Sequence, residues 1–175
     1  MYKKNLLRGV LALGLVAATL PAAAQTRIEI QGARSYMDSH GTNAGFVEAV
    51  FAPQPIGNTR FTWSPDVSAG WIEGRDLGRF RDSHPGTDKN VGLLAGGARF
   101  HYGDADSWYQ PLFFSFQVAG TTQTTQALSS HYQFVSTLGW QAKHFTVGIR
   151  HISNGSLHEP NRGETMALVG FAFDL

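Results

Sequence analysis

Apolar and polar residues alternate along most of the chain with a period of two. From residue 112 to residue 118, for example, every second residue is leucine, phenylalanine or valine, and the polar Ser115 and Gln117 lie between them. Because successive side chains of a β-strand point to opposite faces, this pattern predicts strands with one apolar and one polar face. Pro65 is expected to break or bulge the third strand. The eight predicted strands span residues 26–34, 45–52, 61–73, 91–102, 112–120, 131–141, 144–154 and 164–175.

The number and length of these strands favour a membrane barrel. Several reach the 9–11 residues that a tilted strand needs to cross a bilayer, and eight is the smallest number of strands in a transmembrane barrel. The connection at residues 74–90 is long, whereas Ala142 and Lys143 form nearly a two-residue turn. Polar connections follow the first, third, fifth and seventh strands, as expected if one end of the barrel carries the longer loops. We therefore predict an all-β protein, an eight-stranded antiparallel transmembrane β-barrel of the outer membrane.

The same alternation would also suit a soluble β-sandwich or a lipocalin-like barrel. Such a barrel points its apolar face inward and carries many lysines and glutamates on its outside. After residue 24 this chain has only two lysines, Lys89 and Lys143, both in predicted loops or turns, which favours an apolar face that meets lipid. We expect the charged residues of the polar faces to pair inside a narrow lumen: Arg27, Glu29, Glu48, Arg99 and Arg150. Aromatic residues near the strand ends would form its girdles: Trp63, Trp71, Trp108, Tyr109 and Trp140.

The amino terminus has the pattern of an export signal. Lys3, Lys4 and Arg8 precede an apolar run at residues 10–20, and small residues follow at 22–24. A basic region, a short apolar region and an A-x-A site are typical of a secretory signal peptide. A membrane-anchoring helix is the alternative, but the apolar run is shorter than the roughly 20 residues that a spanning helix needs. We predict a signal peptide at residues 1–24 and a single barrel domain at residues 25–175.

Composition agrees with this picture and excludes several kinds of site. Only 15% of residues are charged and 12% are aromatic, yet the hydrophobic share is a moderate 42%. The chain has no cysteine, which excludes disulfides, a thiolate nucleophile and cysteine-ligated zinc. Without the three basic residues of the predicted signal, 11 basic residues face 13 acidic ones, a formal charge of −2, so no nucleic-acid partner is expected. The histidines show no metal-ligand spacing, and we predict neither a metal nor a cofactor.

One strand departs from the pattern. In residues 145–153 the apolar stripe of Phe145, Val147 and Ile149 continues in step into His151 and Ser153, the one place where we find the stripe turning polar. Residues two apart share a face of a strand, and a polar pair on a lipid-facing stripe is a functional hypothesis by default. An imidazole beside a hydroxyl supplies the parts of an activated serine nucleophile. The alternative is that the strand has already left the membrane at His151, and spacing alone leaves both interpretations open.

Residues 151–164, HISNGSLHEPNRGE, resemble the signature of the PagL-type lipid A 3-O-deacylases, in which an H-x-S-N core is followed by P-N-x-G. The resemblance extends to the export signal, the chain length and the eight-strand pattern. It implies a serine hydrolase of the outer membrane that removes the ester-linked 3-hydroxyacyl chain at position 3 of lipid A in lipopolysaccharide. It also implies an active site on the outside of the barrel that faces the outer leaflet.

By position, the resemblance implies a Ser-His-Glu triad of Ser153, His151 and Glu164. Glu164 lies 13 residues after His151, one fewer than in the family's pattern, and is out of step with the lipid-facing stripe of the last strand. Either it still belongs to the turn or a bulge re-aims it. Glu159, in the loop itself, is the alternative acid.

The resemblance also implies the surroundings of the nucleophile. Asn154 would lie beside the oxyanion hole, Asn161 would be a second conserved asparagine of the loop, and backbone amides near Gly155 and Ser156 would donate to the oxyanion. Substrate acyl chains would lie along the outer stripe of the seventh strand, at Phe145, Val147 and Ile149. The basic residues of the loop after the third strand would either meet lipid A phosphates or belong to a solvated mixed-charge loop: Arg75, Arg79, Arg81 and Lys89.

The expected partners are lipid A, the outer-membrane lipids around the barrel and the barrel-assembly machinery during insertion. Two other classes of function compete with the hydrolase: a non-catalytic structural or adhesive barrel, and a narrow pore. An eight-stranded barrel normally fills its lumen with side chains, which argues against the pore. The sequence leaves open the preferred acyl-chain length, the oligomeric state, a homodimer included, and whether the activity is latent.

Overall fold

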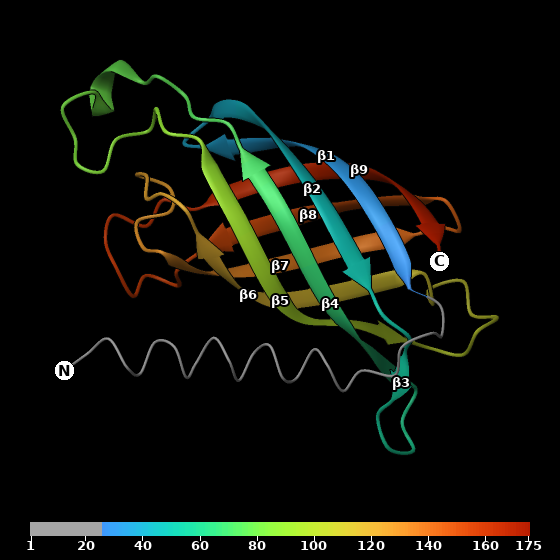
Figure 1. The fold of residues 1–175 in the computed structure, drawn as a ribbon. Helices are drawn as coiled ribbons and strands as arrows, with labels where there is room; N and C mark the ends of the chain where they lie inside the picture. The colour runs from blue at the N-terminus through green and yellow to red at the C-terminus, as the bar shows by residue number, and fades with distance from the viewer. Residues whose placement is uncertain (1–25) are drawn as a thin grey trace.

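The computed structural model describes residues 26–175, and the predicted signal peptide at residues 1–24 lies outside these residues. Eight long strands form a closed antiparallel barrel (Figure 1). Their bounds are β1 (Arg27–Met37), β2 (His40–Val50), β4 (Phe61–Ile72), β5 (Val91–Tyr102), β6 (Leu112–Thr121), β7 (Tyr132–Gln141), β8 (Phe145–Ser153) and β9 (Glu164–Asp174). The two-residue strand β3 (Gln54–Pro55) adds to β4, and a short 3₁₀ helix, η1 (Gly78–Phe80), lies in the loop after β4.

The barrel closes because β1 pairs with both β2 and β9. Gly32 of β1, for example, lies opposite Gly45 of β2 and Val169 of β9. Every other long strand pairs with its neighbours along the chain, and β2 pairs directly with β4. The predicted eight-stranded antiparallel barrel is therefore confirmed. Residues 26–175 contain no helix long and apolar enough to span a membrane.

Two local expectations are wrong. The first connection is a two-residue turn instead of a polar loop, because β1 and β2 stay paired as far as Met37 and His40. Asp38 and Ser39 make this turn with φ values of +47° and +69°, a conformation that aspartate tolerates better than most residues. Pro65 does not break β4: it lies in unbroken register opposite Ala98 of β5, and on its other side its carbonyl accepts a hydrogen bond of 2.9 Å from the backbone N–H of Phe51, just past the end of β2.

Charged side chains pair inside the lumen, as the sequence predicts. The guanidinium of Arg99 donates to Glu29 at 2.9 and 3.0 Å and to Glu48 at 2.9 Å. Arg150 donates to Thr137 at 2.9 Å and also to Glu48. These side chains are fully buried and come from strands on opposite sides of the barrel. They fill the middle of the lumen, which argues against the narrow-pore alternative.

The outer face of the barrel is apolar over most of its area. The large hydrophobic side chains in the middle of this face are between 41% and 70% exposed, as expected for the lipid-facing band of a membrane barrel. Residues that form this band include Ile30, Val47, Val67, Leu94, Phe116, Val118, Leu138, Ile149 and Val169.

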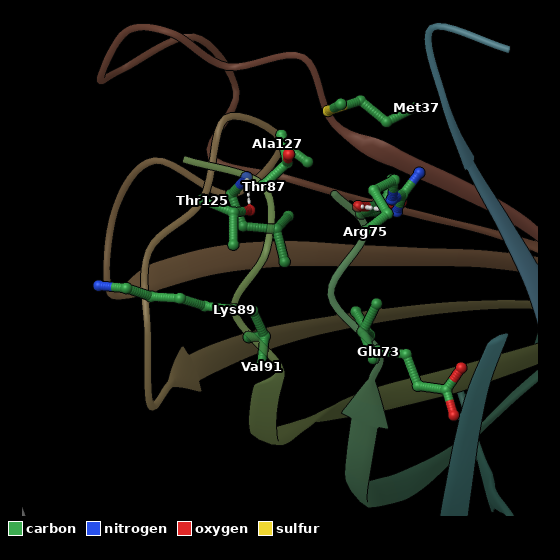
Figure 2. Close-up of a pocket in the computed structure, with 11 residues that line it drawn as sticks. Met37, Glu73, Arg75, Thr87, Lys89, Val91, Thr125 and Ala127 are labelled. Carbon is green, nitrogen blue, oxygen red and sulfur yellow. Dashed lines mark hydrogen bonds and ion pairs between the residues drawn. The ribbon is translucent and has the colours of Figure 1, made fainter. Parts of the chain in front are cut away.

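The longest loop, residues 73–90, lies at one end of the barrel together with residues 122–131 and 154–163, and we call this the loop-bearing end (Figure 1). The opposite end carries the connections at residues 51–60 and 103–111 and the carboxyl terminus, so long connections are not confined to one end as the sequence suggested. Backbone hydrogen bonds join these loops, from Gln126 to Gly86 at 2.9 Å and from Gly163 to Ala127 at 3.0 Å. A small cavity lies between them, with Thr87, Thr125 and Ala127 among its lining residues (Figure 2). The loops thus hold one another in place around the ends of β8 and β9.

Candidate active site

His151 and Ser153 lie on the outer face of β8, within three residues of its end. His151 is exposed and Ser153 is half-buried, whereas Arg150 and Ile152 point into the lumen. Strand alternation continues without a bulge through this segment, since β8 pairs in unbroken register with both of its neighbours. The two side chains therefore share the lipid-facing surface at the loop-bearing end.

The direct partner of His151 is a threonine. A hydrogen bond of 2.8 Å joins His151 Nδ1 to Thr165 Oγ1, because Thr165 of β9 lies directly across from His151. Within the described residues no hydrogen bond joins Ser153 to His151. Such catalytic contacts often form only when substrate is bound, so the absence does not weaken the pair as a candidate.

Gly163 packs closely against the imidazole ring of His151. It has a φ of +71°, and a Cβ on this residue would come within 2.8 Å of His151 Cε1 and 3.3 Å of Nε2. A larger residue would therefore be strained in its backbone and would also push against the ring. The loop before β9 therefore leaves room for the ring of His151 only because residue 163 is a glycine.

Glu164 lies on the other face of β9. It pairs with Ile152, is buried in the lumen, and accepts hydrogen bonds from Ser35 Oγ and from Arg75 Nη2. The structure therefore does not bring Glu164 to His151. Alternation explains the placement: the first residue of β9 points inward, so the next one, Thr165, points outward.

Glu159 also has a partner of its own within the loop. Its carboxylate accepts a hydrogen bond from the backbone N–H of Asn161 at 3.2 Å, and the structure shows no bond between Glu159 and His151.

Thr165 is a site residue that was not predicted from the sequence. The signal that could have identified Thr165 is its position in the outward stripe of β9, two residues before Ala167.

The two predicted asparagines organise the loop after β8. The backbone N–H of Asn154 donates to Asn161 Oδ1 at 3.2 Å. The Asn154 side chain is fully buried, and its Nδ2 donates to Ser129 Oγ at 2.9 Å and to the carbonyl of His158 at 2.8 Å. Its amide group thus joins the loop at residues 122–131 through Ser129 and closes its own loop through His158.

Gly155 and Ser156 form a tight turn immediately after Asn154. Their φ values are +66° and +60°, and the turn is closed by a hydrogen bond of 3.3 Å from Leu157 N to Asn154 O. No partner for the N–H groups of Gly155 and Ser156 is present among residues 26–175. Successive backbone N–H groups in such turns can bind an anion. This pair lies two and three residues beyond Ser153 in the chain.

The sequence profile of a known family matches residues 54–174, which is more than half of the chain, and its description is lipid A 3-O-deacylase (PagL). The chain belongs to the PagL family. A solved structure described as the outer membrane enzyme PagL is 17% identical, with a TM-score of 0.55, and the match covers 83% of this chain and 98% of that one. This likeness supports the fold.

A second solved structure is the attachment invasion locus protein Ail of Yersinia pestis, in complex with a heparin analogue. It is 10% identical, with a TM-score of 0.42, and the match covers 85% of this chain and 98% of that one. No curated protein sequence matches the chain. Membership of the PagL family and the barrel fold together indicate an outer-membrane lipid A deacylase.

The PagL family match covers β4 to β9 and therefore includes the H-x-S-N segment and Thr165. Thr165 is the residue of β9 that contacts the histidine ring.

The basic residues near the site are mostly paired with carboxylates. Arg81 donates to Asp76 at 2.7 Å, and this hydrogen bond raises the pKa of the Arg81 guanidinium above its ordinary value. Arg79 and Arg162 both bind Asp38. The loop after β4 is therefore a mixed-charge loop. Within residues 26–175, no three histidine or acidic side chains converge in a way that could hold a metal ion.

Proposed function

We propose that this protein is a serine hydrolase that removes the ester-linked 3-hydroxyacyl chain at position 3 of lipid A in lipopolysaccharide. The observation that carries the proposal is the position of His151 and Ser153 at the end of an outward apolar stripe of β8. A lipid in the surrounding membrane meets this surface directly, so its ester can reach the serine without entering an internal pocket.

Ser153 Oγ attacks the ester carbonyl, and His151 Nε2 takes the serine proton. The proton then passes to the sugar hydroxyl as it leaves, and a water molecule releases the acyl chain from Ser153 by the same steps. The N–H groups of Gly155 and Ser156 donate to the tetrahedral oxyanion, which is the role that their lack of other partners supports.

The third member of the site differs from the expected Ser-His-Glu triad. In the tautomer that carries its proton on Nδ1, His151 donates to Thr165 Oγ1, and Nε2 is then free to act as the base. Glu164 would have to leave Ser35 and Arg75 and turn to the opposite face of β9 to reach the ring. We assign Thr165 as the group that orients His151 and Glu164 as a positioning residue that anchors the start of β9.

The lipid-facing stripe below His151 suits the acyl chains of the substrate. Phe145, Val147 and Ile149 are 57%, 44% and 60% exposed and continue from the site into the apolar band. The sugar headgroup would then lie at the level of His151 and the loops, which orients the site toward the outer leaflet. Export by the signal at residues 1–24 delivers the protein to that membrane.

The test is mass spectrometry of lipid A from cells that express the wild type, Ser153→Ala or Ser136→Ala. Ser136 is the other outward serine beside His151, directly across the strand pair, and serves as the matched control. We expect loss of one 3-hydroxyacyl chain with the wild type and Ser136→Ala, and fully acylated lipid A with Ser153→Ala. Equal profiles for all three, repeated with purified proteins in detergent to remove any restraint by the membrane, would favour the non-catalytic barrel.

A further inference from the structure

The outer face carries a charged residue that sequence reasoning did not place. The outward positions of β1 are Ile28, Ile30, Gly32, Arg34 and Tyr36, and Arg34 is exposed among them. The apolar stripe therefore turns polar at a second place besides His151 and Ser153. A charged side chain on a lipid-facing surface is costly and indicates a functional site by default.

Arg34 lies near the candidate active site. Only β9 separates its strand from β8, because Arg34 pairs with Ala167 while Thr165 pairs with His151. Two strand spacings across the sheet and two residues along it place the Cα atoms of Arg34 and His151 about 12 Å apart. Both residues lie within four positions of the loop-bearing ends of their strands.

The guanidinium of Arg34 is held on the surface by β2. Nη1 donates to Asn43 Oδ1 at 2.8 Å, and the group lies over Gly41, where a Cβ would come within 2.8 Å of Nε. Asn43 Nδ2 in turn donates to Glu73 Oε2 at 3.0 Å. This arrangement keeps the planar guanidinium against the barrel wall at a fixed place.

Arg34 differs from the basic residues of the loops in its partners. Arg75, Arg79, Arg81 and Arg162 each form an ion pair with a carboxylate, whereas Arg34 forms none among the described residues. Its guanidinium retains donors that no protein group uses. An exposed arginine without an ion pair, near the loop-bearing end of its strand, is suited to bind a phosphate, because the guanidinium fork binds phosphate oxygens in pairs.

We propose that Arg34, with Asn43, binds a phosphate of the lipid A headgroup while Ser153 attacks the acyl ester. The inference rests on the proposed function and adds a subsite to it. The headgroup of lipid A is a phosphorylated pair of sugars, so it can reach from Ser153 across β9 to Arg34. The family match begins at residue 54, so Arg34 on β1 and Asn43 on β2 lie outside the matched residues.

The first test measures binding and does not depend on turnover. Full-length Ser153→Ala barrel in detergent micelles is titrated with lipid A and with lipid A from which the phosphates have been removed, with and without Arg34→Ala. We expect Arg34→Ala to weaken binding of the phosphorylated lipid about tenfold, as for a charged hydrogen bond, and to leave the dephosphorylated lipid unchanged. Arg81→Ala is the matched control and should change neither. Equal weakening for both lipids, or none for either, overturns the proposal.

The second test separates this subsite from the proposed function. In the active protein, Arg34→Ala should raise KM for phosphorylated lipid A with kcat little changed, and Arg34→Lys should recover part of the loss. Adding an anionic phospholipid in excess shows whether another lipid phosphate occupies the subsite. If the subsite at Arg34 binds that phospholipid more tightly than it binds lipid A, the assignment to the substrate is wrong. A wild type that turns over lipid A with a KM unaffected by Arg34→Ala refutes the subsite alone, whereas turnover by Ser153→Ala refutes the function.

Discussion

Replacing Thr165 by valine tests which residue orients His151. Valine has nearly the same shape as threonine but has no hydroxyl, so the change removes only the 2.8 Å bond to Nδ1. One neutral hydrogen bond contributes about 1 kcal/mol, which corresponds to about a fivefold change in rate. We therefore expect Thr165→Val to lower kcat about fivefold with KM unchanged, and Thr165→Ser, which keeps the hydroxyl, to stay near the wild type.

The same experiment includes Glu164→Gln, for which the two assignments differ widely. When a triad carboxylate is replaced by an amide, kcat falls about ten-thousandfold, because the histidine adopts the wrong tautomer. In this structure Glu164 contacts Ser35 and Arg75 instead of His151, so we expect kcat per folded molecule to fall less than about fivefold.

The assay is release of the 3-hydroxyacyl chain from lipid A by purified protein in micelles. The folded fraction of each variant is measured in the same samples, because Glu164→Gln weakens an ion pair with Arg75 that is nearly buried. A wild-type rate for Thr165→Val together with a ten-thousandfold loss for Glu164→Gln would refute the reasoning. That outcome would mean that Glu164 turns outward when substrate binds.

Three further variants probe the support of the site. Gly163→Ala should abolish most activity with the barrel intact, because its Cβ would press on the ring of His151; wild-type kcat would contradict the fit described above. Asn154→Ala removes one hydrogen bond to the loop at residues 122–131 and one within its own loop, so residues 154–163 should become sensitive to protease while β8 stays protected. Unchanged cleavage would contradict this role. Arg99→Met removes the buried ion pairs of Arg99 with Glu29 and Glu48 and should lower the free energy of unfolding by about 3–5 kcal/mol. The exposed Arg60→Met should change it by less than about 1 kcal/mol, and similar denaturation midpoints for the two variants would contradict the lumen network.

The alternation of side chains predicted most of the fold, because the residues that face lipid along each strand must be apolar. Residues 91–102 were predicted as a strand and form β5 with the same bounds, since apolar positions must face lipid along its whole length. At the loop-bearing end this requirement weakens. Ser35 and Thr42 are polar and face the lumen, so the extension of β1 and β2 into a tight hairpin resembled a polar loop in the sequence.

The same reasoning explains what could be predicted of the site. His151 and Ser153 were placed on the outer face because they continue a stripe that starts at Phe145. A motif gives only the distance along the chain, and it therefore assigned Glu164 without regard to the face on which it lies. The outward position of Thr165 follows from the stripe of the strand predicted at residues 164–175, but the stripe does not say that Thr165 contacts His151. The outward, lipid-facing position of Arg34 was not predicted, because the first strand was expected to end at residue 34.

The most direct test of the central claim is incubation of purified wild-type and Ser153→Ala protein with lipid A in detergent, followed by mass spectrometry of the lipid. The account predicts that the wild type removes the single ester-linked 3-hydroxyacyl chain at position 3 and that Ser153→Ala, equally folded, leaves the lipid unchanged. Loss of the same chain with both proteins, or cleavage by the wild type at another position only, would contradict it.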